Sequence, residues 1–206
     1  MAGGFYPGPV DGLGPTIDID PETLARTAMQ PPAPVGLQAK GGSAKNGAAV
    51  SGAQVVNFAI DRMGQRLGRG ECFDLADQAL RNAGAKSAAD FGTVVENADY
   101  VWGNQVNLSD VQPGDIIQFR NYRYDRTIDT ETRTDTDIQE RPHHTAIVEI
   151  VGADGAITVL EQNAPEGDPV RRSQLFFSTV TTSSSGGRTT TITVHDRFRF
   201  YRPQPR

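Results

Sequence analysis

The chain has 206 residues, of which 37% are hydrophobic and 22% are charged, and its formal net charge is -5. This length is sufficient for one domain with one hydrophobic core. The negative charge argues against a dedicated nucleic-acid-binding protein, because no excess of Lys and Arg is available to neutralise phosphates. The mean hydropathy is -0.44 and no apolar run approaches the roughly 20 residues that cross a bilayer, so we expect no membrane partner.

Residues 1–49 are predicted to form a flexible arm ahead of the folded domain. They are rich in Gly, Pro and Ala and show no sustained apolar period. The first residues have neither a basic start nor an apolar central stretch, so we expect no secretory signal peptide. Synthesis in the cytoplasm is expected, with any delivery outside by lysis or by a route other than Sec export. Residues 50–206 are expected to form the domain.

Two helices are predicted at the start of the domain. From Ser51, apolar residues recur at helical spacing as far as Leu67. A second helix begins near Cys72, carries apolar residues at steps of three and four, and is closed by Gly84. A further short helix is expected over residues 94–100.

Beyond Trp102 the sequence changes to short β-rich runs that are separated by turn residues. Residues 121–141 and 178–188, rich in Thr, Ser and charged residues, are expected to form exposed hairpins or loops. Because helices come first and strands follow, the sequence predicts an α+β domain in which N-terminal helices pack on an antiparallel β-sheet. The predicted strands are residues 115–120, 143–151, 156–163 and 189–201.

Cys72 is the only cysteine, which excludes an intramolecular disulfide and any multi-cysteine metal site. It follows a Gly-Arg-Gly turn at the start of a predicted helix. Free backbone N–H groups and the positive end of the helix dipole stabilise a thiolate there, and they can also receive an oxyanion. Glu71, Asp74 and Asp77 act in the opposite direction, so a nearby imidazolium is required. The alternative is a buried cysteine that packs as a small hydrophobe.

A hairpin over residues 143–165 brings polar side chains to the end of an apolar face. A two-residue turn at 154–155 would place His144 one diagonal step from Asn163, with Glu161 two residues further along the same face. His143 points to the opposite face. The same register places Val148 opposite Glu161 and puts Ile150 on the core side. These pairings fix which groups can reach the imidazole.

Polar groups on an apolar face are costly unless they are paired, and a catalytic site supplies a reason for them. His144 would take the proton of the cysteine, while Asn163 or Glu161 would orient the imidazole, Asn163 being the closer of the two. The order Cys, His, Asn along the chain is that of papain-like enzymes. The alternative is a hydrogen-bonded structural cluster at a strand end. Zinc is not favoured, because adjacent histidines on a strand point to opposite faces and no standard ligand spacing is present.

Several motifs in this order resemble the CHAP family of cysteine, histidine-dependent amidohydrolases and peptidases, which have a papain-like core. The similarity covers residues 51–203 and implies Cys72 as nucleophile, His144 as base, and Glu161 with Asn163 as the orienting pair. Two features depart from the family: the long connection over residues 121–141, and Phe73 where a tryptophan frequently follows the cysteine. The motifs are GRGECFDL around the cysteine, QPGDIIQF at 112–119, HTAIV from His144, EQN from Glu161, and FYRP at 200–203.

The sequence therefore predicts a cysteine hydrolase that cleaves amide bonds through an acyl-thioester and requires no cofactor. The resemblance implies a peptidoglycan amidase or endopeptidase, with peptidoglycan or a peptide as substrate. An alternative is a papain-like hydrolase or acyltransferase that acts on a cytoplasmic protein or a small amide. A second alternative is a non-catalytic binding module on the same fold. Trp102, the only tryptophan, is expected either to line the groove or to fill the core.

Overall fold

A computed structural model describes residues 49–184 and 186–206. The predicted arm lies outside these residues except for its last position, and its flexibility stays a prediction. None of the described helices has the length and apolar character needed to span a membrane. The elements are helices α2 (Gly52–Ile60) and α3 (Cys72–Asn82), short 3-10 helices η1 (Ala88–Asp90) and η2 (Leu108–Asp110), and strands β1 (Asn104–Val106), β2 (Ile116–Asp129), β3 (Thr134–Val151), β4 (Ala156–Glu161), β5 (Arg171–Phe176), β6 (Val180–Ser183) and β7 (Thr189–Arg202).

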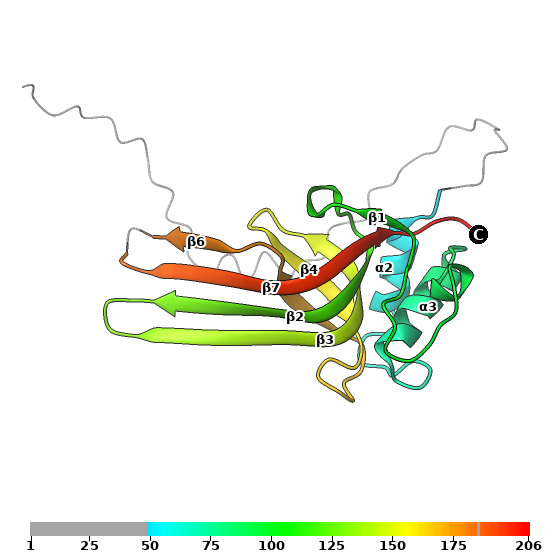
Figure 1. The fold of residues 1–206 in the computed structure, drawn as a ribbon, viewed down its shortest axis with the longest axis horizontal. Coiled ribbons are helices and arrows are strands. Elements are labelled where there is room, and N and C mark those ends of the chain that lie inside the picture. The colour runs from blue at the N-terminus through cyan, green and yellow to red at the C-terminus, as the bar shows by residue number, and fades with distance from the viewer. Residues whose placement is uncertain (1–48, 185) are drawn as a thin grey trace, which may run out of the picture. The chain divides into compact units, whose positions relative to one another are not determined.

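The strands form one antiparallel sheet in the order β1-β7-β2-β3-β4-β5, with β6 paired to β7 (Figure 1). Strand β3 is paired unevenly along its length. It pairs with β2 from Thr134 to Ile147, whereas β4 pairs with it only from Ile147 to Val151. Among the described residues, positions 134–146 of β3 therefore have a strand partner on one side only.

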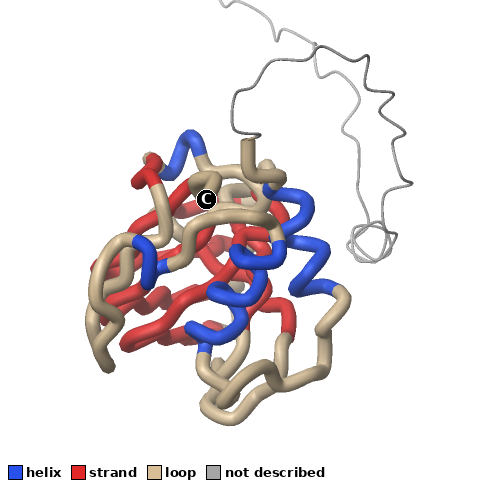
Figure 2. The backbone as a smooth tube through the Cα atoms, turned by 90° about the vertical axis from the view of Figure 1, so that its right-hand side faces the viewer, coloured by secondary structure: helices blue, strands red, loops and turns tan. Residues whose placement is uncertain are grey.

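The predicted fold class is wrong, because the sheet and not a layer of N-terminal helices makes up most of the domain. In the described part of the chain only α2 and α3 are α-helical, and both are short (Figure 2). Residues 121–141 form the outer parts of β2 and β3, so of the two forms predicted for them the hairpin is confirmed. Tyr122 and Tyr124 alternate into the core, which is the period of a strand. Residues 94–100 contain turns and no helix.

The first helix ends earlier than its apolar period predicts. The helix starts close to Ser51 as predicted, with Ser51 as its N-cap, but α2 stops at Ile60 and not at Leu67. The backbone N–H of Gly64 donates to the carbonyl oxygen of Val170 at 2.8 Å, so it is not available to a continued helix. A long-range contact has overridden the local periodicity. The second helix agrees closely with the prediction, since α3 starts at Cys72 and ends just before Gly84.

Two clusters of buried side chains make up the core. In the first, residues of α2 and α3 meet residues from one end of the sheet: Val55, Leu75, Leu80, Ile116, Ile147 and Leu160. The second is aromatic and joins strands that are distant in the sheet order. Phe177, just after β5, stacks on Tyr122 of β2 with ring centroids 5.4 Å apart and contacts Phe200 of β7 at 5.0 Å. The sheet is therefore curled so that β5 approaches β2 and β7.

The β3–β4 hairpin differs from its predicted register in two compensating ways. The N–H of Gly152 donates to the carbonyl oxygen of Ala156, which makes the loop one residue longer than predicted. Side chains of β4 that were predicted to share a face with given residues of β3 would then lie on the opposite face of the sheet. A β-bulge between Val148 and Ile150 then exchanges them back. Beyond the bulge Val148 lies opposite Val159 and not opposite Glu161. Ile150, predicted in the core, is 54% exposed.

We predict that Gly114→Ala destabilises the domain much more than Gly155→Ala. Both glycines have φ in the left-handed region, but a Cβ at Gly114 would collide with the backbone of Gly52, whereas a Cβ at Gly155 would meet open space. The expected loss in free energy of unfolding is roughly 2–4 kcal/mol for Gly114→Ala and about 1 kcal/mol for Gly155→Ala. Urea denaturation of both variants measures the difference. Equal losses would show that the approach of Gly52 to Gly114 adds no strain.

Candidate active site

Cys72 is the first residue of α3 and is partly exposed. The turn before it is held by Asp74, whose carboxylate accepts hydrogen bonds from the backbone N–H groups of Arg69 at 2.7 Å and Glu71 at 3.2 Å. The Asp74 charge is thus engaged in fixing the turn that presents Cys72. The predicted position of the cysteine, at the start of a helix and after a tight turn, is confirmed.

Gln162 fixes the same turn from the other side of the site, although no role was predicted for it from the sequence. Its side chain is fully buried, accepts a hydrogen bond from the N–H of Leu67 at 2.7 Å, and donates to the carbonyl oxygens of Leu67 and Glu71. This one amide therefore ties the end of β4 to the loop that leads into Cys72. The signal in the sequence was its place between two predicted site residues.

His144 lies on β3 with 4% of its surface exposed. Its Nε2 is 3.1 Å from Oε2 of Glu161, but the ring N–H is not aligned with that oxygen, so the two form an ion pair without a well-directed hydrogen bond. Burial by itself lowers the pKa of His144. Short polar contacts and charge interactions with Cys72 and Glu161 outweigh burial and raise this pKa to about 9. The imidazolium is thus the favoured form at neutral pH.

Glu161 ends β4 and has no exposed surface. Arg141 holds it with two hydrogen bonds, Nε to Oε2 at 2.9 Å and Nη2 to Oε1 at 2.6 Å. Burial raises the pKa of Glu161, but the short contact with His144 and the hydrogen bonds from Arg141 outweigh it and lower the pKa to about 2. The carboxylate is therefore ionised beside the imidazole.

Asn163 does not occupy the place that the predicted register gave it. Its Nδ2 donates to Glu71 at 3.2 Å and its Oδ1 accepts from the N–H of Gly167 at 2.6 Å. The observed pairing of β3 with β4, continued past its last bonded pair, puts Glu161 one diagonal step from His144. Glu161 thus takes the position that had been assigned to Asn163.

His143 lies on the other face of β3, as strand alternation predicts. Its Nε2 is 2.7 Å from the carbonyl oxygen of Ala98, and its ring lies 5.8 Å from that of Tyr100. Tyr100 also contacts Phe73, the residue after Cys72, with ring centroids 5.1 Å apart. Trp102 fills the core, and of the two places predicted for it this is the one observed.

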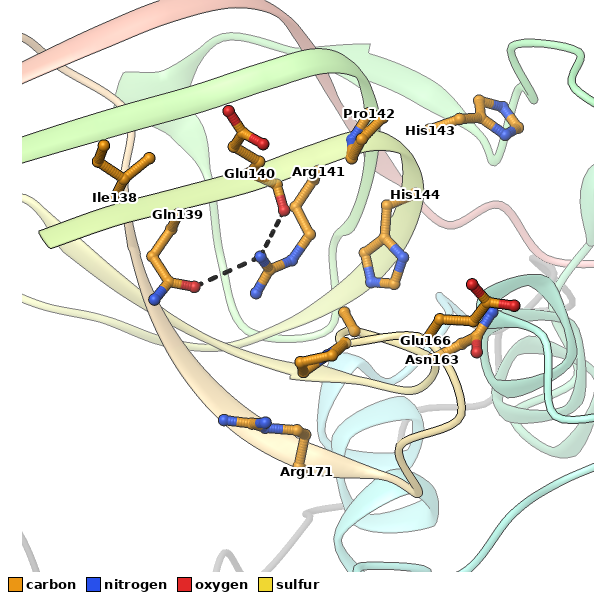
Figure 3. A pocket seen from close by; sticks show the side chains of 12 residues that line it. Ile138, Gln139, Glu140, Arg141, Pro142, His143, His144, Asn163, Glu166 and Arg171 are labelled. Atoms are coloured by element: carbon orange, nitrogen blue, oxygen red, sulfur yellow. Dashed lines mark hydrogen bonds between the residues drawn. The ribbon is translucent and has the colours of Figure 1, made fainter.

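A groove of about 660 Å³ opens beside His144 (Figure 3). One wall is the segment of β3 from Ile138 to His144, and the other is the loop that carries Asn163 and Glu166, with Arg171 at the start of β5. The groove is lined by both polar and apolar side chains. Within the described residues, no three His, Cys, Asp or Glu side chains are placed to bind a metal ion.

Comparison with protein families gives a match that covers most of the chain. The family described as the AIM3/BBC1 cysteine proteinase-fold domain matches residues 28–182, which is more than half of the chain. The chain therefore belongs to this family, and the description supports a papain-like fold. Searches of curated proteins and of solved structures found no match.

We predict that the folded protein loses stability in acid because the Glu161 carboxylate becomes protonated. A carboxyl whose pKa is lowered in the folded state stabilises that state above its ordinary pKa of 4.5, and this contribution is lost as the pH falls towards about 2. Glu161→Gln should be less stable at pH 7 and should show a flatter decline between pH 4.5 and 2. Denaturant titrations at several pH values test this.

The exposed residue Glu166 provides the control for that measurement. Glu166→Gln should keep the steep decline of the wild-type protein. If Glu161→Gln declined as steeply as wild type, the Glu161 carboxylate would not be the group that links stability to pH.

Proposed function

Given that the chain is an AIM3/BBC1 cysteine proteinase-fold domain, we propose that it is a cysteine hydrolase acting on amide bonds, with Cys72 as nucleophile and His144 as acid and base. The observation that carries the proposal is the buried imidazole of His144, which contacts the Glu161 carboxylate and whose pKa is raised by Cys72 and Glu161. A nucleophile, a base and an orienting group are the minimum set for acyl transfer. Glu161 is the proposed orienting residue.

The reaction follows from this arrangement. The Cys72 thiolate attacks the amide carbonyl carbon, and the carbonyl π electrons move to oxygen. Backbone N–H groups in the first turn of α3, which lack intrahelical partners, can stabilise that oxyanion. The His144 imidazolium then donates its proton to the leaving amine as the C–N bond breaks. Water then attacks the thioester carbon while His144 takes its proton, the C–S bond breaks, and the acid product leaves behind the Cys72 thiolate and the His144 imidazolium.

The substrate class is proposed from the resemblance to the CHAP family, which favours an amide bond in peptidoglycan. The groove along β3 accommodates a ligand of several residues and carries both charges, with Glu166 and Arg171 among its lining residues. A polypeptide or a small amide is the second candidate for the same chemistry. Mass spectrometry of purified peptidoglycan fragments and of unmodified peptides, after incubation with the protein, distinguishes these substrates.

We predict that Cys72→Ala abolishes hydrolysis and leaves the melting temperature nearly unchanged. The substitution removes one sulfur from a partly exposed position and keeps the buried stripe of α3. Stoichiometric alkylation of the wild-type protein should abolish turnover as well. Hydrolysis by a folded Cys72→Ala protein at the wild-type rate would exclude Cys72 as the nucleophile.

We also predict that Glu161→Gln and Asn163→Ala differ strongly in turnover. Glu161→Gln should lower kcat by roughly two to four powers of ten, as for the third member of a triad, because the imidazole loses its charged partner. Asn163→Ala should have a modest effect, since its amide bonds only the neighbouring loop and Glu71. His143→Ala, on the opposite face of β3, is the matched control for His144→Ala. If Asn163→Ala lowered kcat more than Glu161→Gln did, Glu161 would be excluded as the orienting residue.

A further inference from the structure

Arg141 is a charged residue that neither the motifs nor the proposed chemistry use. Its side chain is 8% exposed and meets the fully buried Glu161. The guanidinium contacts both carboxylate oxygens, which is the geometry in which Arg pairs most strongly and most specifically with a carboxylate. Its remaining nitrogen donates to the carbonyl oxygen of Glu140 at 2.7 Å, which fixes the guanidinium to the backbone of β3.

The Glu161 oxygen that faces the imidazole is also one that Arg141 holds. Oε2 accepts the Nε–H of Arg141 at 2.9 Å and lies 3.1 Å from Nε2 of His144. Tyr122 of β2 lies beside this pair, but its hydroxyl donates to the carbonyl oxygen of Phe176. Cys72 also interacts with His144, since it helps to raise the pKa of the imidazole. Arg141, Glu161 and His144 thus form a row of contacts, and Cys72 acts on the last member of this row.

We infer that Arg141 is a positioning residue of this site, acting on the Cys72–His144 pair through Glu161. The inference rests on the proposed function and adds the group that keeps the orienting carboxylate ionised and fixed. A buried carboxylate without a partner is strongly destabilised and takes up a proton instead. A protonated Glu161 would no longer attract the imidazolium that accompanies the Cys72 thiolate.

The only cysteine in the chain allows a test that needs no substrate. In the alkylation of Cys72 the thiolate sulfur displaces iodide from iodoacetamide, so the rate against pH reports the thiolate that His144 sustains. In Arg141→Met we expect the alkylation rate to rise with pH about one pH unit later than in the wild-type protein. At pH 5 this is a loss of roughly tenfold in rate. Arg141→Lys, which keeps one charged donor, should restore part of the rate.

Arg172 provides a matched control. It makes hydrogen bonds of 2.6 to 2.9 Å to both oxygens of Glu149 on the same sheet. Arg172→Met therefore removes a similar ion pair that has no contact with His144, and it should leave the alkylation profile unchanged. An equal shift in Arg172→Met and Arg141→Met would show a general effect of lost charge or stability and would overturn the inference.

The double variant Arg141→Met/Glu161→Gln tests the route of the effect. If Arg141 acts through Glu161, its removal should change the profile little once Glu161 has become Gln. Additive shifts would overturn the inference, as would a wild-type profile in folded Arg141→Met. The double variant removes both buried charges together, so it remains informative if Arg141→Met alone fails to fold.

Failure of the proposed function gives a different result. If Cys72 and His144 do not form a reactive pair, Cys72 will be alkylated at acid pH no faster in the wild-type protein than in the His144→Ala variant. The inference alone fails if wild type shows that elevated rate and Arg141→Met retains it.

Discussion

The site is organised around one carboxylate that has no access to water. Glu161 is fully buried, so its charge must be balanced by protein groups, and Arg141 and His144 are the two that contact it. The requirement acts in both directions: the imidazolium lowers the pKa of the carboxyl, and the carboxylate raises the pKa of the imidazole. Removal of Glu161 leaves both Arg141 and His144 without their common partner, and removal of Arg141 leaves Glu161 with His144 alone. The ionic row of Arg141, Glu161 and His144 therefore determines both the chemistry of the site and which substitutions the site tolerates.

The strands that carry this row meet the required geometry through an irregular hairpin. The loop after β3 exchanges the faces of the sheet, and the bulge beside Glu149 exchanges them back, so that His144 and Glu161 face each other across β3 and β4. Opposite them, Gln162 and Asp74 hold the turn before Cys72. The irregular β3–β4 hairpin and the buried polar side chains together place the N-terminus of α3 beside His144 of β3.

Local patterns in the sequence predict the parts of this site but not its connections. The helix at Cys72 and the common face of His144 and Glu161 follow from periodicity, and both are observed. The preference for Asn163 was wrong in register, because one added loop residue and one bulge shift a strand pairing without a visible sequence signal. Arg141 lies in a stretch that has the composition of a loop, and its role depends on a contact 20 residues away. At Arg141 a contact between distant parts of the chain overrode the local composition of the sequence.

The uneven pairing of β3 has a consequence for local unfolding. From His144 to Ile147 the strand is buried on both faces, and at Ile147 it pairs with a strand on each side. Towards Thr134 it is mostly exposed and has a strand partner on one side only. The free energy needed to open the backbone should therefore rise along the strand, and amide hydrogen exchange should slow in the same direction. The end of the β2–β3 hairpin near Thr134 can therefore open transiently without disturbing Glu161 and Arg141. The protein thus concentrates its rigidity at the end of the sheet where the ionic row lies.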